Sequence, residues 1–288
     1  MLDLFYTPFS EFEFMRRALV GVMAIALGGG PVGVFLMLRR MSLTGDAMAH
    51  AILPGAAVGY LVAGLSLPAM TIGGLFAGVI VAVAAGLVSR FTALKEDASL
   101  AAFYLLSLAL GVTIVSLRGS NVDLLHVLFG TVLALDDSTL LLLSSISTIT
   151  VLALALLYRP LVLECVDPIF LRSVSRAGTP THLIFLGLVV MNLVGGFHAL
   201  GTLLAVGMMM LPAAASRFWS NDITVMMLLS VAIGIASGLS GLLLSFHAEL
   251  PAGPAIILSA GAAYVLSLLL GRKGGVLWLA WPGKHLEA

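Results

Sequence analysis

Asp46 and His50 are the two residues of this chain whose types and spacing best suit chemistry. They stand four residues apart, so a helix places both side chains on one face. Both belong to an apolar run that continues to about Gly64. An ionisable side chain inside a membrane span costs about 2.5–3.5 kcal/mol and usually marks a substrate path, a relay or an ion pair. Carboxylate and imidazole ligands suit zinc and manganese alike, so the pair predicts a cation site.

Two ligands cannot complete a closed metal site, and the remaining ligands could come from water, from a second copy of the chain, or from His247 and Glu249. These two residues lie at the end of another apolar run, just before Pro251. Simpler interpretations are also open. Asp46 could instead be the N-cap of a helix, a position that favours Asp, with His50 hydrogen-bonded inside the bundle. His247 and Glu249 could form a solvated helix end.

The composition indicates a polytopic membrane protein. Hydrophobic residues make up 60% of the chain and charged residues only 10%, against about 25% charged residues in globular proteins. Apolar runs long enough to cross a hydrocarbon layer of about 30 Å lie near 18–38, 47–64, 69–89, 98–117, 138–158, 223–246 and 254–271. The segment 180–217 is too long for one span, and Gly195, Gly196 and Gly201 divide it into two helices or one broken helix.

We therefore expect an all-α integral membrane protein with eight or nine transmembrane helices, in which residues 1–288 form a single transmembrane domain. Small residues are scattered through the spans, as close helix packing in lipid requires. Three segments do not fit as spans. We expect an amphipathic interfacial segment at 4–14, a short re-entrant or interfacial helix within 118–137, and a cytoplasmic loop at 159–179.

The placement of the charges predicts the orientation. The net charge is zero, which gives no basic field for nucleic acid. If nine crossings are counted, most basic residues fall in alternate loops, which the positive-inside rule makes cytoplasmic, together with the C-terminus. Arg16 and Arg17 disagree with this orientation, and a signal peptide is the alternative interpretation of that start, although the apolar run continues to Leu38. The single cysteine, Cys165, excludes an intramolecular disulfide.

The loop at 159–179 contains a helix start signal. Asp167 is suited to the N-cap and Pro168 to the first helical position, Phe170 and Arg172 follow, and Gly178 ends the segment. A short amphipathic helix at the cytoplasmic face suits the docking of a soluble partner. An ordinary capped connector is the alternative.

Several blocks, in order along nearly the whole chain, together resemble the permease family of bacterial ATP-binding-cassette importers for zinc, manganese or iron. The most specific block is Leu-Arg-Arg-Met-Ser-Leu-Thr-Gly-Asp-Ala at 38–47, with His50 and Leu-Pro-Gly at 53–55. The weaker blocks are Glu-Asp-Ala at 96–98, Leu-Phe-Gly at 128–130, Asp-Pro at 167–168, Gly-Thr-Leu-Leu at 201–204, Leu-Pro-Ala-Ala at 211–214 and Pro-Ala-Gly-Pro at 251–254.

The resemblance implies a homodimer in the bacterial cytoplasmic (inner) membrane, with a cytoplasmic ATPase dimer and an extracytoplasmic metal-binding protein as partners besides the membrane lipid. It implies that Asp46 and His50 line the path as metal ligands, that Glu249 is a further candidate, and that the segment around Asp167 to Gly178 is the coupling helix. The resemblance implies a transport subunit and not an enzyme. ATP hydrolysis would be on a separate partner chain, because no G-x-x-x-x-G-K-[ST] phosphate loop occurs in this one. No permanently bound cofactor is expected, only the transported divalent metal.

The sequence leaves open which metal is transported and which energy source drives transport. We favour zinc as the substrate, with manganese or iron as the alternative. An ion-coupled secondary metal carrier would also place Asp and His in the membrane, but it should work without an ATPase. An intramembrane metallohydrolase would need a motif such as H-E-x-x-H, which is absent. Counting from Arg40 also puts Asp46 near the cytoplasmic edge of its span, lower than expected for a metal received from outside.

Overall fold

The computed structural model describes residues 2–64, 66–92, 96–117, 132–167, 170–171 and 178–277. Within these ranges the chain forms helices and turns and no strand, which confirms the predicted all-α fold. The helices are α1 (Leu2–Glu11), α2 (Glu13–Leu38), α3 (Ser42–Ala51), α4 (Leu53–Ala63), α5 (Leu67–Phe91), α6 (Glu96–Leu117), the 3-10 turn η1 (Val132–Ala134), α8 (Asp137–Val166), α10 (Gly178–Leu200), α11 (Thr202–Arg217), α12 (Ile223–Ala248) and α13 (Ala252–Leu270).

Seven segments of the described chain are long and apolar enough to cross a membrane: α2, the combined stretch of α3 and α4, α5, α8, α10, α12 and α13. Two shorter apolar helices, at 98–114 in α6 and at α11, bring the described crossings to nine if both cross. The predicted division of the segment 180–217 occurs at Gly201, whose φ of 83° ends α10 and starts α11. Gly195 and Gly196, in contrast, lie inside α10.

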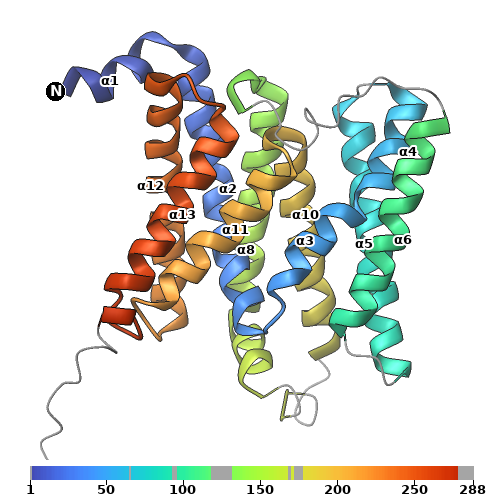
Figure 1. Ribbon diagram of the computed structural model, residues 1–288. Helices are drawn as coiled ribbons and strands as arrows, with labels where there is room; N and C mark the ends of the chain where they lie inside the picture. The colour runs from blue at the N-terminus through green and yellow to red at the C-terminus, as the bar shows by residue number, and fades with distance from the viewer. Residues whose placement is uncertain are drawn as a thin grey trace, which may run out of the picture.

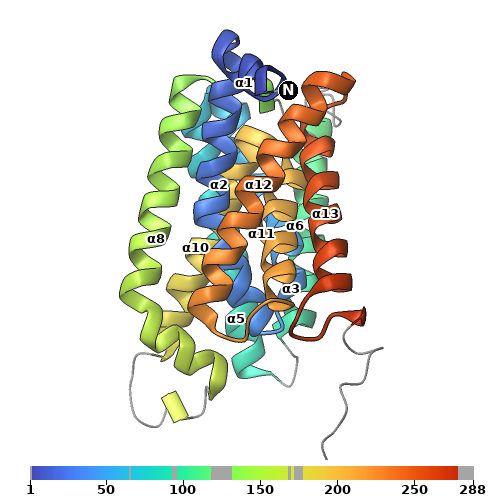
Figure 2. The same cartoon turned by 90° about the vertical axis from the view of Figure 1, so that its left-hand side faces the viewer.

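The helices form one bundle, and α1 projects from the edge of one end, beside α2 and α12 (Figure 1). α4, α5 and α6 lie on the side opposite to α12 and α13, and α2 packs in between against α8, α11 and α12. α8 flanks the bundle on a third side (Figure 2). α1 overlaps the predicted interfacial segment at 4–14, and the end of the bundle beside which it lies is the predicted outer end. The opposite end, where α2, α8 and α13 finish, is the predicted cytoplasmic end.

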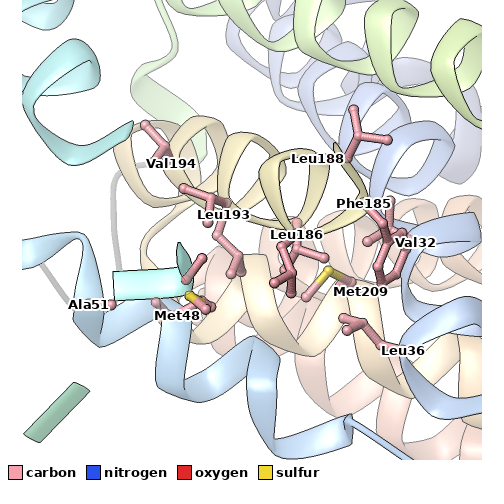
Figure 3. Close-up of a cluster of buried hydrophobic side chains, with 14 of the residues drawn as sticks. Val32, Leu36, Met48, Ala51, Phe185, Leu186, Leu188, Leu193, Val194 and Met209 are labelled. Atoms are coloured by element: carbon pink, nitrogen blue, oxygen red, sulfur yellow. The ribbon is translucent and has the colours of Figure 1, made fainter. Parts of the chain in front are cut away.

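The core that holds α3 in place is shared by α2, α10 and α11. Met48 of α3 is fully buried and faces Leu193 of α10, while Phe185 and Met209 continue the same cluster toward Leu36 of α2 (Figure 3). Burial of this apolar surface removes it from contact with lipid and water and orients one face of α3 inward. The opposite part of α3 is left for polar residues.

Glycines bring two pairs of helices into backbone contact. A Cβ on Gly55 of α4 would clash with the carbonyl oxygen of Gly73 on α5, and a Cβ on Gly33 of α2 would clash with the carbonyl oxygen of Met209 on α11. Small residues at helix crossings are the usual means of tight packing in membranes. α4 and α5 are therefore joined through their backbones.

The start of the loop predicted at 159–179 was wrong. α8 continues through Arg159 and Pro160 to Val166, so the connection begins at Asp167. A proline inside a helix costs about 3 kcal/mol, but Leu161 beyond it is fully buried in the core and offsets part of that cost. Most of the predicted re-entrant helix within 118–137 lies outside the described residues, which include only η1 and the start of α8.

Candidate metal site

The helix that carries Asp46 and His50 is interrupted two residues after His50. Ile52 forms the turn between α3 and α4, and Pro54 lies in the first turn of α4. Pro54 has no N–H to donate to the carbonyl oxygen of His50, four residues earlier, and its ring crowds that carbonyl. Ile52 keeps right-handed helical angles and donates to the carbonyl oxygen of Met48 over 3.3 Å, so the interruption is a local one within a single span. Interrupted membrane helices are common places for ion and substrate sites in transporters.

A neighbouring helix satisfies part of the interrupted backbone. The hydroxyl of Ser107 on α6 is buried and donates to the carbonyl oxygen of Ala51 over 2.9 Å. Gly111, one turn further along α6, allows close approach, because a Cβ there would lie 3.1 Å from the nitrogen of Pro54. Where a proline interrupts the hydrogen bonds of a membrane helix, neighbouring helices commonly supply such partners. α6 therefore supports the break directly.

Asp46 and His50 face one another, as their spacing predicts. Nε2 of His50 lies 3.8 Å from Oδ1 of Asp46, which is too long for a hydrogen bond. A metal ion bound to both atoms at about 2.1 Å in tetrahedral geometry would hold them about 3.4 Å apart. A small movement of either side chain would therefore bring both atoms into the ligand sphere of one ion. The ring of His50 stacks on Tyr104 of α6, with 6.2 Å between the ring centroids.

The alternative role of Asp46 as a helix cap does not fit the structure. α3 begins at Ser42 with Met41 in the N-cap position, and Asp46 lies inside the helix. Its side chain is 65% exposed and that of His50 is 28% exposed within the single chain. A helix-capping interaction therefore cannot account for this carboxylate.

A cavity of about 150 Å³ lies between α3 and α6 beside this carboxylate. Its lining is Leu43, Thr44, Asp46, Ala47, Leu100, Ala101 and Tyr104. The Thr44 hydroxyl and Nδ1 of His50 are buried without a hydrogen-bond partner among the described residues. Buried polar groups normally have partners, often water. The cavity has room for several waters or a hydrated ion, which would supply a partner for Thr44.

α3 contacts α11 on its other side through flexible side chains. The Cε atoms of Met209 and Met210 lie 3.0 and 3.1 Å from the position that a Cβ on Gly45 would occupy. Unlike the contact between α4 and α5, this contact is made by the tips of methionine side chains, which adapt easily. α3 also rises obliquely from the predicted cytoplasmic end toward the middle of the bundle (Figure 1).

The structure does not add His247 or Glu249 to this pair. Glu249 is the left-handed C-cap of α12, with φ of 54°, and both residues are exposed at the predicted outer end of the bundle. Among the described residues, no group of three His, Cys, Asp or Glu side chains could hold a metal ion. The role of His247 and Glu249 as metal ligands stays a prediction. A complete site formed with Asp46 and His50 needs further ligands from elsewhere.

The segment predicted to couple to the ATPase is described in part. Oδ1 of Asp167 accepts a hydrogen bond of 2.9 Å from the backbone N–H of Phe170, which is the expected N-cap contact. Phe170 is half-exposed and Leu171 is buried. Gly178 is the first residue of α10 and is buried. Pro168 and Arg172 lie outside the described residues.

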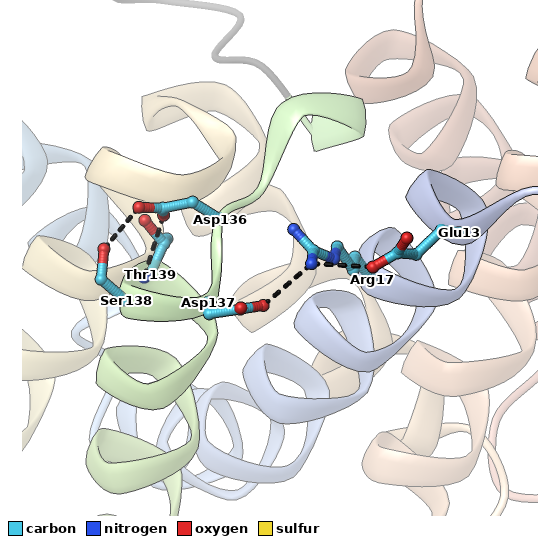
Figure 4. A network of polar contacts seen from close by, with 6 residues as sticks. All are labelled: Glu13, Arg17, Asp136, Asp137, Ser138 and Thr139. Carbon is cyan, nitrogen blue, oxygen red and sulfur yellow. Dashed lines mark hydrogen bonds and ion pairs between the residues drawn. The ribbon is translucent and has the colours of Figure 1, made fainter.

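The predicted outer end carries a second polar network. Arg17 lies 2.8 Å from Glu13 and 3.1 Å from Asp137, which joins α2 to the start of α8 (Figure 4). Asp136 caps α8 by accepting from the N–H of Thr139 over 3.0 Å. Hydrogen bonds from the Ser138 hydroxyl and from Thr139 lower the pKa of Asp136 to about 2. Arg17, which disagreed with the positive-inside rule, thus has two acidic partners.

Sequence reasoning missed the residues that surround the metal pair. Tyr104 and Ser107 contact α3 from α6 and belong to an apolar run with no motif around it. Thr44 lies inside the motif block at 38–47, but nothing in that block indicated that it lines a cavity. The signal that could have indicated the break was Pro54, four residues after His50. The contacts across to α6 carry no comparable sequence signal.

Comparisons with known proteins agree with this fold. A family model described as the ABC 3 transport family matches residues 11–271. The chain is 31% identical over 287 residues to the manganese transport system membrane protein MntC of Halalkalibacterium halodurans, covering 99% of this chain and 97% of that protein. It is 30% identical to the manganese import system permease protein ScaB of Streptococcus parasanguinis, covering 95% and 96%.

A solved structure described as PsaBC from Streptococcus pneumoniae in complex with Fab has a TM-score of 0.84 and 27% identity, covering 98% of this chain and all of that chain. The family match and the apolar helices confirm the predicted resemblance and the predicted location. The chain therefore belongs to the ABC 3 transport family, as a multi-pass permease subunit of the bacterial cytoplasmic membrane.

Proposed function

We propose that this chain forms the membrane path of an ATP-driven importer and that its substrate is a divalent transition metal, with manganese as the metal carried. The observation that carries the proposal is the pair of Asp46 and His50, 3.8 Å apart on a membrane helix that breaks directly after them. An incomplete ligand set suits transport, because an ion held by a closed cage would leave slowly.

The choice of manganese over zinc rests on the relatives. Two of them, at 31% and 30% identity, are named for manganese transport, whereas the sequence alone favoured zinc. Carboxylate and water ligands suit manganese well, and imidazole is compatible with it. Divalent metals bind nitrogen and oxygen sites in an order that puts manganese below zinc, so selectivity must arise from geometry or from delivery.

The exposure of Asp46 supports a second copy of the chain. A carboxylate that is 65% exposed on a membrane helix cannot be left facing lipid, because burying a charge there is too costly. A second copy would cover Asp46 and could supply the missing ligands from its own pair. We therefore propose a homodimer with the metal path at the interface between the two chains.

We further propose soluble partners at each end. The segment from Asp167 to Gly178, with half-exposed Phe170, would dock on a cytoplasmic ATPase dimer. The outer end, where His247 and Glu249 are exposed, would receive metal from an extracytoplasmic binding protein. ATP supplied to the ATPase would then drive the opening and closing of the path.

The test is uptake of radioactive manganese and zinc, in competition, by proteoliposomes that hold the assembled transporter and its binding protein. Wild type should take up manganese in preference to zinc and only with ATP. Asp46→Ala and His50→Ala should each reduce uptake at least tenfold without loss of assembly. Thr148→Ala, an exposed hydroxyl of α8, is the control and should transport normally.

Other outcomes would change the conclusion. Preferential uptake of zinc would restore the metal first favoured from the sequence. Uptake that needs no ATP would indicate an ion-coupled carrier. Normal uptake by both variants would show that Asp46 and His50 are not ligands on the path.

A further inference from the structure

Three ionisable side chains lie buried together at the predicted cytoplasmic end of the bundle, and we call them the Arg39 cluster. Nη2 of Arg39 donates to Oε1 of Glu164 over 3.1 Å and also contacts Nδ1 of His182. Nδ1 of His182 lies 3.7 Å from the same carboxylate oxygen. The side chains of Arg39, Glu164 and His182 are 10%, 8% and 10% exposed. They come from the end of α2, the last turns of α8 and the first turns of α10.

The cluster rests on the core that also holds α3. The guanidinium of Arg39 lies 5.1 Å from the centroid of the Phe185 ring, a cation–π geometry. Phe185 is fully buried, meets Phe35 edge-on at 6.2 Å, and shares one core cluster with Met48 of α3. A displacement of Arg39 is therefore felt by the side chains that pack against α3.

Stability alone does not account for these charges. Replacing a buried ion pair by apolar residues is often neutral or stabilising, because removing two charges from water is costly. Here the cost is not fully compensated, since Nη1 of Arg39 and Oε2 of Glu164 are buried without a hydrogen-bond partner among the described residues. A buried charged cluster in a chain with only 10% charged residues is better explained by a role in fixing an arrangement.

The cluster joins both ends of the segment between α8 and α10 to the start of α3. Glu164 lies three residues before Asp167, and His182 lies four residues after Gly178. Both contact the guanidinium of Arg39, which lies three residues before the first residue of α3. One side chain therefore connects the proposed docking segment to the helix that carries Asp46.

We propose that the Arg39 cluster transmits movement of the docking segment to α3, and that Arg39 is a positioning residue for the pair of Asp46 and His50. This inference rests on the proposed function. The turn after Arg39 is tight, because Arg40 has a left-handed φ of 59°, so displacement of Arg39 passes to α3 over a short, bent connection. Among the described residues, Nη1 of Arg39 and Oε2 of Glu164 have no partner in this arrangement, so both atoms are available for other hydrogen bonds when the segment moves.

The experiment separates coupling from folding. Arg39→Met with Glu164→Leu replaces both charges by apolar side chains of similar volume, and Glu164→Gln removes one charge at constant shape. Each variant is assembled with its ATPase and binding protein in proteoliposomes, and its thermal midpoint, ATPase rate and metal uptake per ATP are measured. Arg17→Gln is the matched control, since Arg17 forms ion pairs at the opposite end of the bundle.

The double variant should keep a thermal midpoint within a few degrees of wild type and a normal ATPase rate, while metal uptake per ATP falls at least tenfold. Glu164→Gln should lower the same ratio severalfold, and Arg17→Gln should leave it unchanged. Wild-type uptake per ATP in both cluster variants would overturn the proposal. If the double variant does not assemble, the ratio for Glu164→Gln decides. If the wild-type protein shows no ATP-driven metal uptake, the proposed function is refuted, and not only the role of the Arg39 cluster.

Discussion

The carbonyl oxygen of His50 lies four residues before Pro54, the one residue type that cannot donate a hydrogen bond to it. This relationship separates α3 from α4 within what the apolar pattern presents as one span. It also places His50 in the last turn of α3, where the backbone needs support from Ser107. The break and the metal pair are therefore parts of one structural unit.

Removing the break should impair transport without unfolding the protein. In Pro54→Ala the restored N–H can donate to the carbonyl of His50, so α3 and α4 can straighten into one helix and turn His50 away from its present position. We expect metal uptake to fall about tenfold with little change in the thermal midpoint. Pro68→Ala is the matched control. Pro68 also lies in the first turn of a helix, but the N-cap of that helix, Ser66, is extended, so no preceding helix is interrupted there. Equal uptake by both variants would argue against a role for the break.

The backbone contact between α4 and α5 should not tolerate a methyl group. In Gly55→Ala the new Cβ would clash with the carbonyl oxygen of Gly73, and neither backbone can move without disturbing the bundle. Overpacking of this kind costs about 1–3 kcal/mol. We expect a clear drop in the thermal midpoint of the purified protein. Gly261→Ala, where an added Cβ meets nothing within 4 Å, should show no such drop.

The cap at the start of α8 should make stability depend on pH. The folded-state pKa of Asp136 is lowered to about 2 from 3.8, chiefly by the hydrogen bond from Ser138. A lowered pKa stabilises the fold above the unfolded value and loses that contribution as pH falls from about 4 toward 2. Asp136→Asn should therefore lower the thermal midpoint at neutral pH, and the difference from wild type should shrink below pH 4. Ser138→Ala should give part of the same effect. A difference that does not vary with pH would contradict this assignment.

The half-exposed aromatic ring of the docking segment should matter for coupling. Phe170→Ala removes an apolar contact surface while Asp167 still caps the segment, because the cap uses the backbone N–H at position 170. We expect metal uptake per ATP to fall severalfold with an unchanged thermal midpoint. Leu156→Ala is the control. Leu156 lies in α8, outside the docking segment, and is 84% exposed, so its loss should leave metal uptake per ATP at the wild-type value. An unaffected Phe170→Ala variant would place the docking surface elsewhere.

The order of the helices was largely predictable because a membrane span leaves a long apolar signature. The pairing of Asp46 with His50 was predictable for a similar reason, since helical periodicity alone places residues four apart on one face. The break at Ile52 was not, because Leu53 and Gly55 continue the apolar run on both sides of Pro54, and prolines are tolerated in membrane helices.

Contacts between distant parts of the chain could not be predicted. Arg39 and Glu164 are 125 positions apart, and Arg39 and His182 are 143 apart. In the sequence, each of these three residues looks like an ordinary ionisable residue near the end of a span. Only packing of α2, α8 and α10 brings them together and removes them from water. The length of α8 was misjudged for a related reason, since burial of Leu161 is a tertiary effect.

The unequal anchoring of α3 and α4 has a mechanical consequence. α4 is fixed to α5 by backbone contact at Gly55, whereas the side of α3 at Gly45 meets only the adaptable ends of Met209 and Met210. If α3 tilts, Ile52 is the point about which it would turn. At a rise of about 1.5 Å per residue, Asp46 lies about 9 Å from this point and His50 about 3 Å. A small tilt of α3 would then move the Asp46 carboxylate about three times as far as the His50 imidazole. The tilt would separate the two ligands of a bound ion mainly by displacing the carboxylate.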